Sequence, residues 1–506
     1  MKKLHKKLIF FILFGGAYVL LQAQSDKINL IAKKEQNCFP NTNKTYLSIK
    51  QGSAKTTYIS AIVNDKTDPC LTQGILFTVT GEPSSFKITS SNNEVVPDSN
   101  IIMQQIEGDN YALKIKPIGT GYSTINIKAD NGKSSSIYKI KYAASAKINA
   151  TNSIFPIGIS DASGAVSIDE NYMFVADDES NILSLYNRKV SGDPLYIIDI
   201  SSKAGGSGDD EFDIEGASFS SNNYNLGKRI YWIGSLGNGK NGNPKPSRNR
   251  IIATDLIGDG ANSTLSVKSY STNLRKAIIA WGDSNSWNFS YSANLIPKRL
   301  DGFNVEGITT TNEGEIGYIA FRAPCVPLQG EKPTINNRKF AIIAPINNLE
   351  RMMDVEGKTT IKPEIGEPIL FNLDGLGIRD IIQIKDKGYL ILAGLYKSGG
   401  IPVLYLWNGK VPKTPGLEPI TTASSCLIKL PLDLSSIVKQ TNGDKINGFP
   451  EAVLCDIKDD TLNIQLLFDN GTEDFYNDNI EAKSLEQKEY KKFQVVNLQY
   501  VYTTNK

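Results

Sequence analysis

The stretch Phe303-Asn304-Val305-Glu306-Gly307 decides the fold, because a version of it returns four more times in the chain. In each version, one or two acidic residues are followed directly by small or apolar residues, and a hydrophobic, strand-like segment comes next. The other four are Ile159-Ser160-Asp161-Ala162-Ser163, Phe212-Asp213-Ile214-Glu215-Gly216, Gly377-Ile378-Arg379-Asp380-Ile381 and Phe449-Pro450-Glu451-Ala452-Val453. Recurrence at intervals of about 50 to 90 residues is typical of circular repeat proteins. We therefore predict an all-β chain whose larger part is a β-propeller of five or six blades.

Strand-like segments follow each repeat at similar offsets. Tyr172 to Ala176 and Ile182 to Tyr186 follow the first repeat, and Arg229 to Ser235 follows the second. The last alternation of apolar and polar residues, Phe493 to Tyr502, is expected to close the ring by joining the first blade. A stacked β-sandwich is the alternative, although repeated carboxylates at strand starts are not expected of one. We assign residues 154–506 to the propeller.

Residues 25–147 are predicted to form a separate domain, a small β-sandwich. Two segments that alternate apolar and polar residues, 124–128 and 137–142, flank Asn131-Gly132, which is a strong hairpin turn. Together with residues 90–96, this region resembles bacterial immunoglobulin-like repeats. The resemblance implies a spacer or adhesive module without catalysis.

Residues 1–23 have the pattern of a secretory signal peptide. Four lysines precede an apolar run from Leu8 to Leu21, and its 14 residues fall short of the roughly 20 that span a bilayer. We expect a protein that is exported through the inner membrane and is periplasmic, on the cell surface or extracellular. The mature chain is expected to have no transmembrane segment.

Loss of this segment would lower the formal net charge from +2 to −2, because four lysines leave and no acidic residue does. It would also remove His5, the only histidine. A chain without histidine is excluded from Ser-His-Asp and Cys-His catalysis and from His-ligated zinc. The near-neutral balance, without basic clusters, also argues against nucleic acid as a partner.

The five cysteines suggest disulfides formed after export. Cys38 and Cys70 are the expected first pair, and Cys426 with Cys455 is a second. Cys325 is left over and is expected to be a buried thiol, since no histidine could activate it.

In a propeller, the same position of each repeat points toward one axis. These positions are Asp161, Glu215, Glu306, Asp380 and Glu451. Uncompensated carboxylates that converge raise one another's pKa values, and oxygen ligands without histidine favour Ca²⁺ over zinc or copper. We predict Glu215, Glu306 and Glu451 as metal ligands. In the alternative interpretation, Arg322 and Arg379 neutralise the ring as a buried ion-pair network.

Catalytic roles are predicted for the remaining ring carboxylates and the two arginines. Asp161 and Asp380 are the expected general bases. Arg322 directly follows a buried strand, where an unpaired arginine would be costly, and Arg379 is adjacent to Asp380. We expect these arginines to stabilise developing negative charge or to orient a carboxylate.

The loop from Leu236 to Arg250 is long, polar and basic. One hypothesis is that Lys240, Arg248 and Arg250 bind a small anionic substrate there. The other interpretation is a solvated hairpin, which the composition favours. The loop is not a phosphate loop, because no GK[ST] ending or following helix is present.

The ordered repeats resemble a bacterial family of uncharacterised propellers, domain of unknown function 3616, over about residues 154–470. The resemblance rests on residues 160–163, 175–179, 213–217, 231–235, 302–307 and 377–380. The Glu-Gly pairs at Glu215 and Glu306 are also similar to esterase-like phytase propellers. That similarity implies a secreted phosphoester hydrolase assisted by Ca²⁺, with both glutamates as metal or substrate ligands. Phytate itself is not expected, because no dense lysine cluster surrounds the ring.

Two functions are consistent with these observations. The first is Ca²⁺-assisted hydrolysis of a phosphoester or lactone, and the second is recognition of a glycan or protein on the rim without turnover. Fold does not decide between them. The arginines predicted to be buried favour hydrolysis slightly.

Overall fold

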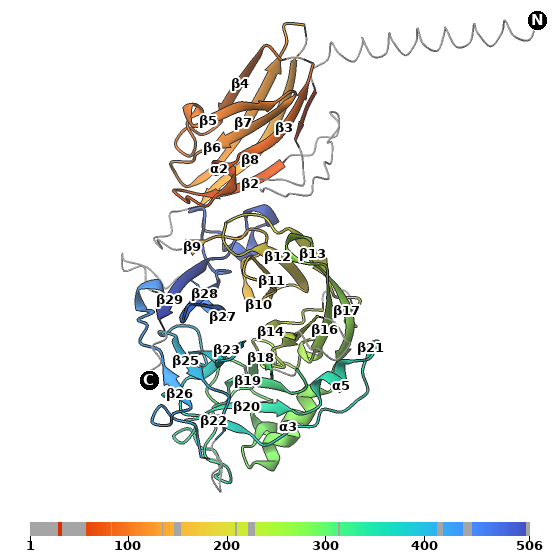
Figure 1. The fold of residues 1–506 in the computed structure, drawn as a ribbon, viewed down its shortest axis with the longest axis vertical. Coiled ribbons are helices and arrows are strands. Elements are labelled where there is room, and N and C mark those ends of the chain that lie inside the picture. Colours follow the sequence, from red (N-terminus) through yellow and green to blue (C-terminus); the bar gives the residue numbers. More distant parts are fainter. Residues whose placement is uncertain are drawn as a thin grey trace, which may run out of the picture.

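The structure is a computed structural model that describes residues 29–32, 57–81, 83–133, 135–145, 153–207, 210–220, 228–311, 314–411, 418–438 and 448–501. Strands dominate these residues and form seven sheets among them, so the chain is all-β as predicted (Figure 1). The predicted signal peptide, Cys38 and Tyr502 lie outside the described residues. Within the described ranges, no helix is both long enough and apolar enough to cross a membrane.

Two four-stranded sheets form the N-terminal part. One contains β1 (Asn29–Ala32), β3 (Ile75–Thr80), β6 (Asn110–Ile115) and β5 (Ile101–Glu107), and the other contains β2 (Thr57–Ile62), β8 (Ser135–Ser145), β7 (Gly121–Asp130) and β4 (Ser85–Ser90). The predicted hairpin around Asn131-Gly132 joins β7 to β8, with Asp130 opposite Ser135. Phe77, Ile127 and Tyr142 are part of the core between the two sheets.

The other five sheets lie around a common centre (Figure 1). In chain order the first is β10 (Ala162–Ser167), β11 (Tyr172–Asp177), β12 (Ile182–Asn187) and β13 (Tyr196–Asp199), and the second is β14 (Ile214–Ser220), β15 (Arg229–Gly234), β16 (Ile251–Ile257), β17 (Thr264–Ser271) and β21 (Gly357–Lys358). The third is β18 (Asn304–Thr310), β19 (Gly317–Ala323), β20 (Ala341–Ile346) and β22 (Ile369–Phe371), and the fourth is β23 (Gly377–Ile384), β24 (Gly388–Gly394), β25 (Val403–Trp407) and β26 (Leu427–Lys429). The fifth is β27 (Phe449–Lys458), β28 (Thr461–Asp469), β29 (Val495–Val501) and β9 (Ser153–Ile154).

The inner strands of the five sheets contact one another in a closed cycle. β10 contacts β14, then β18, β23 and β27 follow in turn, and β27 contacts β10 again. A separate hydrophobic core fills each of the five spaces between neighbouring sheets. The buried apolar residues of the repeats therefore hold sheet to sheet around the whole cycle.

The ring closes differently from the prediction. β29 does not join the first sheet, because Val495 and Val496 pair with Ile154 and Ser153 of β9. The start and the end of this part of the chain thus complete the fifth sheet together. This closure uses main-chain hydrogen bonds between strands that are far apart in sequence, so the alternation in the C-terminal run could not identify its partner.

Short helices and 3₁₀ turns connect the strands. The helices are α2 (Pro69–Thr72), α3 (Leu274–Ser284), α4 (Phe289–Ser292), α5 (Leu349–Met353) and α6 (Ser435–Val438), and the 3₁₀ turns are η2 (Asp98–Asn100), η3 (Pro246–Arg248), η4 (Gly260–Asn262), η5 (Ala482–Ser484) and η6 (Lys488–Tyr490). α3 and α4 pack outside the second and third sheets, where Leu274 and Phe289 enter the core between them.

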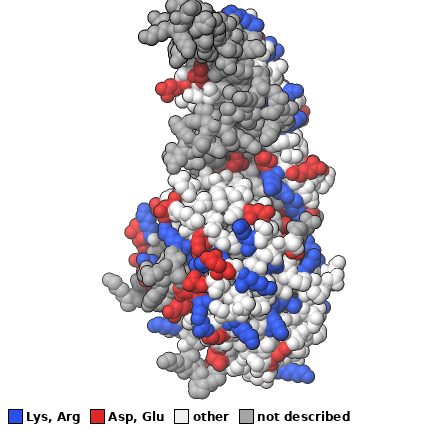
Figure 2. Space-filling view, turned by 90° about the vertical axis from the view of Figure 1, so that its right-hand side faces the viewer, with Lys and Arg blue, Asp and Glu red and all other residues white. Residues whose placement is uncertain are grey.

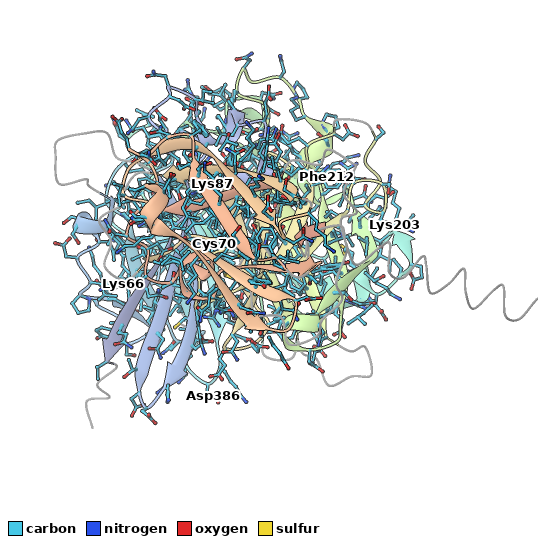
Figure 3. All side chains as sticks on the ribbon, turned by 90° about the horizontal axis from the view of Figure 1, so that it is seen from above. Lys66, Cys70, Lys87, Lys203, Phe212 and Asp386 are labelled. Atoms are coloured by element: carbon cyan, nitrogen blue, oxygen red, sulfur yellow. The ribbon has the colours of Figure 1, made fainter. Side chains whose placement is uncertain are left out.

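The two N-terminal sheets lie over one side of the ring (Figure 3). Ala143 of β8 packs with Phe475, Tyr476 and Tyr490, which come from the segment between β28 and β29. The buried Nζ of Lys492 donates hydrogen bonds to the carbonyl oxygen of Ala61, at 3.0 Å, and to Ser145 Oγ, at 3.2 Å. Aromatic packing and a buried lysine therefore join the two parts.

The cysteine predictions are corrected in one respect. Cys70 is disulfide-bonded, and Cys38, its expected partner, lies outside the described residues. Cys426 and Cys455 are free thiols, so the second predicted disulfide is wrong. They belong to different sheets: Cys426 precedes β26 and Cys455 lies within β27. Cys325 is free and buried, and burial raises the pKa of its thiol to about 12.

Candidate functional site

Each inner strand carries a β-bulge near its start. The pairing register shifts between Ala162 and Gly164, Ile214 and Gly216, Val305 and Gly307, Ile378 and Asp380, and Pro450 and Ala452. The extra residues are Ser163, Glu215, Glu306, Arg379 and Glu451. A bulge re-aims its side chain and bends the strand, which brings polar side chains to the same end of every inner strand.

This register corrects the alignment of the repeats. Glu215, Glu306 and Glu451 do occupy equivalent positions, but the first and fourth repeats contribute Ser163 and Arg379 instead of Asp161 and Asp380. A displacement of one or two residues is invisible in the sequence, because a bulge changes the alternation of the strand only locally.

The glycines that follow the bulges allow the inner strands to approach closely. A Cβ atom at Gly216 would lie 3.1 Å from the carbonyl oxygen of Glu306, and one at Gly164 would lie 3.1 Å from the nitrogen of Gly216. The Glu-Gly pairs in the sequence therefore combine a side chain aimed at the centre with a backbone contact to the next sheet.

A pocket of about 840 Å³ opens at the end of the ring where the inner strands begin. Its lining includes Asp161, Asp178, Asp213, Glu215, Glu451 and Asp469, together with Lys240, Lys298, Arg248 and Arg322. Over the ring-forming part, acidic and basic side chains are interspersed on the face that Figure 2 shows. The site thus gathers charges of both signs from residues that are far apart in the chain.

Two of the three predicted metal ligands are engaged by arginines. Glu306, only 2% exposed, forms an ion pair with Arg322, and its other oxygen lies 3.4 Å from Nη1 of Arg379. The same Nη1 lies 2.7 Å from Glu451 Oε1. Arg379 is 1% exposed and links the carboxylates of Glu306 and Glu451. It also donates hydrogen bonds to two main-chain carbonyl oxygens.

Glu215 differs from these two glutamates. Its side chain is 8% exposed and, within the described chain, forms neither a hydrogen bond nor an ion pair. Burial raises the pKa of its carboxyl well above the usual value, and the neighbouring carboxylates Asp213, Glu306 and Glu451 raise it further. A buried carboxylate without a partner is costly and requires a proton or a cation.

The structure brings Glu215 together with two residues that the metal prediction left out. One carboxylate oxygen from each of Asp178, Asp213 and Glu215 lies within 4.8 Å of the others. Nη1 of Arg248 donates to Asp213 Oδ2 at 2.7 Å, so Asp213 is the member of the group that already has a charge partner. Burial raises the pKa of Asp178 well above its usual value and that of Asp213 to about 6. Oxygen ligands in this arrangement suit Ca²⁺.

The two predicted general bases have different environments. Asp380 is 2% exposed, and its oxygens accept hydrogen bonds from the backbone N–H groups of Ile381 and Val453, both at 2.8 Å. It therefore fastens β23 to β27 and does not line the pocket. Asp161 does line it, opposite Asp469 in an isolated bridge, and burial raises the pKa values of these two carboxyls to about 6 and about 7.

The basic loop contributes unevenly. Lys240 is exposed at the pocket, and Arg248 lines it while pairing with Glu211 and Asp213. Arg250 is buried elsewhere: its guanidinium stacks 4.2 Å from the ring centre of Phe212 and donates to the carbonyl oxygens of Ala204 and Gly205. Arg250 is therefore a packing residue, and its partner Phe212 is labelled in Figure 3.

The sequence-based ligand set does not include Asp178, Asp213 or Asp469. The sequence allows two interpretations of the acidic stretch Asp177-Asp178-Glu179, a cation site or a solvated turn, and its composition favours the turn. Asp213 stands two residues before Glu215 in the repeat, and Asp469 ends the strand β28. Their positions in the chain could have identified these acids, because each lies where a strand begins or ends at the end of the ring that carries the pocket.

Comparisons with known proteins do not assign a family. No family model matches the chain, and no curated protein matches it. Among solved structures, a candidate phosphatase from Bacteroides thetaiotaomicron is 9% identical with a TM-score of 0.27, over 69% of this chain and 66% of that one. A DUF4784 family protein from Bacteroides caccae is 9% identical with a TM-score of 0.20, over 82% and 90% of the two chains. A quinonprotein alcohol dehydrogenase-like protein from Bacteroides thetaiotaomicron is 11% identical with a TM-score of 0.18, over 86% and 82%. These likenesses are too distant to carry an argument, and the resemblance to the uncharacterised propeller family stays a prediction.

Proposed function

We propose that the chain is an exported hydrolase in which an immunoglobulin-like sandwich precedes a five-bladed β-propeller. The pocket of the propeller would hydrolyse phosphoesters or lactones with the help of Ca²⁺. The closed cycle of inner-strand contacts and the five separate cores support the propeller. The two facing N-terminal sheets support the sandwich.

The unpartnered carboxylate of Glu215 carries the proposal. Among the described residues, Glu215 is buried without a partner, whereas the equivalent Glu306 and Glu451 are paired with arginines. Burying a carboxylate without a partner is costly unless a ligand compensates its charge. Asp178, Asp213 and Glu215 offer oxygen atoms only, and a mature chain without histidine favours a hard cation. Bound there, Ca²⁺ would polarise a phosphoryl or lactone oxygen and help to position water.

The protein groups would supply the remaining chemistry. Asp469 lines the pocket, and because burial raises the pKa of its carboxyl to about 7, it is suited to accept the proton of the attacking water. The water oxygen forms a bond to phosphorus, the bond to the ester oxygen breaks, and the leaving alkoxide takes a proton from solvent. Arg322 and Lys298, which also line the pocket, would stabilise the developing negative charge.

The test combines calcium binding with a substrate screen. Protein treated with EGTA is titrated with Ca²⁺ while its thermal unfolding is followed, and phosphomonoesters and lactones are screened in parallel. Binding to the native state should stabilise it by about 2.7 kcal/mol when free Ca²⁺ is a hundred times Kd. Glu215→Gln should reduce this stabilisation and lose the activity, whereas Asp469→Asn should keep the full stabilisation and lose activity by about 10² to 10⁴-fold.

Glu356→Gln is the matched control, because Glu356 is an exposed acid whose ion pair with Lys268 lies outside the pocket. It should behave as the unaltered protein in both measurements. Stabilisation by Ca²⁺ that is undiminished in Glu215→Gln would contradict the assigned site. Hydrolysis that is insensitive to EGTA and to Glu215→Gln would contradict the proposed chemistry.

A second hollow favours recognition as an additional candidate function. It has a volume of about 1480 Å³ and lies beside the fifth sheet, where Gln465 pairs with Asn497 and Gln499 pairs with Asn463. Rows of amide side chains can exchange hydrogen bonds with glycan hydroxyl groups. Capture of glycans on an array, lost in Gln499→Leu and retained in Glu215→Gln, would support glycan recognition by this face.

A further inference from the structure

The acidic cluster of the pocket extends beyond the three residues assigned to Ca²⁺. One oxygen from each of Asp161, Asp177 and Asp178 lies within 4.8 Å of the others, and this second group shares Asp178 with the group that contains Glu215. Asp161 precedes β10, while Asp177 ends β11 and Asp178 follows it. Two neighbouring strands of the first sheet thus extend the cluster contributed by the second sheet.

The positive charges that act on the second group do not form ion pairs with it. Lys483, whose charge acts on Asp161, forms its ion pairs with Glu179 and Glu481, and Lys491 acts on Asp177 without pairing with it. Within the described residues, none of its three aspartates forms an ion pair with lysine or arginine. Ser160 Oγ donates to Asp161 Oδ2 at 2.5 Å, and Ser180 Oγ donates to Asp177 Oδ2 at 2.7 Å, so each serine occupies one oxygen. Asp178 Oδ1 is buried and has no hydrogen-bond partner. Together with the buried, unpartnered Glu215, it points to a ligand between the groups.

A charge balance favours a second calcium ion. Asp213 is already paired with Arg248, so a single divalent cation would balance Asp178 and Glu215. Asp161 and Asp177 would remain buried side by side, and burial together with the charge of Asp177 raises the pKa of Asp161. Gly471 leaves room for the carboxylate of Asp161. A Cβ atom at this position would lie only 1.7 Å from Asp161 Oδ1, so no other residue would fit there without displacing it.

We propose that the pocket holds two divalent cations bridged by the carboxylate of Asp178, the second being bound by Asp161 and Asp177. This inference rests on the proposed function, since it completes the same site. It also narrows the substrate class: two adjacent cations can stabilise both the attacking and the leaving oxygen of an in-line displacement at phosphorus. Phosphoesters are therefore the expected substrates, in preference to lactones.

The stoichiometry of calcium binding tests the second position directly. EGTA-treated protein is titrated with Ca²⁺ to millimolar concentrations by isothermal titration calorimetry. The unaltered protein should bind two equivalents, and Asp161→Asn should bind one. Asp177→Asn provides a second variant for the same position, and circular dichroism confirms that each variant is folded. Glu215→Gln should retain one equivalent, and Asp178→Asn should weaken both by at least about tenfold, because it removes the bridge.

The outcomes separate this inference from the function on which it rests. One equivalent in the unaltered protein, lost in Glu215→Gln, would overturn the second position and leave the proposed hydrolase intact. Two equivalents that persist in both Asp161→Asn and Asp177→Asn would overturn the assigned ligands. No binding at all would overturn the calcium site as a whole. A preference of at least about tenfold in kcat/KM for phosphomonoesters over lactones is expected, and the reverse preference would contradict the narrowed substrate class.

Discussion

Glu215 and Glu306 occupy equivalent bulges and yet have different charge partners. β19 supplies Arg322 beside Glu306, whereas β15 ends in Ile233-Gly234 and supplies no basic residue to Glu215. The same backbone feature therefore carries an ion-paired glutamate in one sheet and an unpaired glutamate in the neighbouring sheet. Whether the glutamate of a bulge has a charge partner thus depends on one residue near the end of the neighbouring strand, which is Arg322 in β19 and is not basic in β15.

The buried ion pairs of Arg379 lead to a stability prediction. Arg379→Met should lower the free energy of unfolding by about 3 to 5 kcal/mol, because it leaves Glu451 and one oxygen of Glu306 as uncompensated buried charges. Urea unfolding measures the change. Arg351→Met is the control, since its pair with Glu364 is exposed and worth about 0 to 1 kcal/mol. Equal losses in the two variants would contradict the role of Arg379.

Asp68 leads to a pH prediction. Burial raises the pKa of its carboxyl to about 7, from about 3.9 in an unfolded chain. Between these values the folded state binds a proton that the unfolded state releases, so stability should fall as pH rises from about 4 to about 7. Asp65 adds like charge nearby, and Lys492 cannot compensate above pH 7, because burial lowers the pKa of its amine to about 7.

Asp68→Asn should therefore be more stable than the unaltered protein at pH 8 and nearly equal to it at pH 4, where the carboxyl is protonated in the folded state and about half protonated in the unfolded state. The amide oxygen can still accept the hydrogen bond from the Cys70 N–H, so the turn is retained. Urea unfolding at the two pH values measures the difference, with Asp374→Asn as an exposed control. An unchanged pH slope in Asp68→Asn would show that this carboxyl does not titrate as expected.

At the scale of elements, the bulge and its glycine act as one unit. Gly307 contacts both neighbouring strands, and a Cβ atom there would lie 3.1 Å from the Ala320 Cβ and from Ile381 Cγ2. Such overpacking typically costs 1 to 3 kcal/mol. Gly307→Ala should lose about that amount in thermal or urea unfolding. Gly239→Ala, whose nearest atom is the flexible Lys245 side chain at 3.4 Å, should change stability by less than about 0.5 kcal/mol. Comparable losses in both would refute the close-approach explanation.

At the scale of the whole molecule, the contact between the N-terminal sheets and the ring leads to a prediction about cooperativity. Tyr476 packs against Tyr122 at 5.0 Å and Tyr490 at 5.8 Å between ring centres, and it also faces Lys492 Nζ. Tyr476→Ala removes the centre of this contact, so one calorimetric unfolding transition should separate into two. Tyr291→Ala, at an exposed tyrosine outside the contact, should not change the number of transitions. A single transition in Tyr476→Ala would mean that other contacts suffice to couple the parts.

The sequence alone predicts the all-β class and the order of the five repeats, and it indicates an acidic centre, but it leaves five or six blades open. These are local properties. Alternation of apolar and polar residues produces strands, and a recurring Glu-Gly pair can be recognised without knowing which residues lie near it in space. Glu215, Glu306 and Glu451 could be placed in equivalent positions because each precedes a small residue in its strand.

Which of these acids lack a charge partner depends on the tertiary structure. Partner choice depends on distances between residues far apart in the chain: Arg322 and Arg379 satisfy Glu306, Asp380 fastens two strands, and Asp178 from an acidic turn meets Glu215 from another sheet. A bulge shifts the register by one residue without a sequence signature, which separates Arg379 from Asp380. The strength of electrostatic interaction depends on burial and distance, and neither is encoded in any short stretch of the chain.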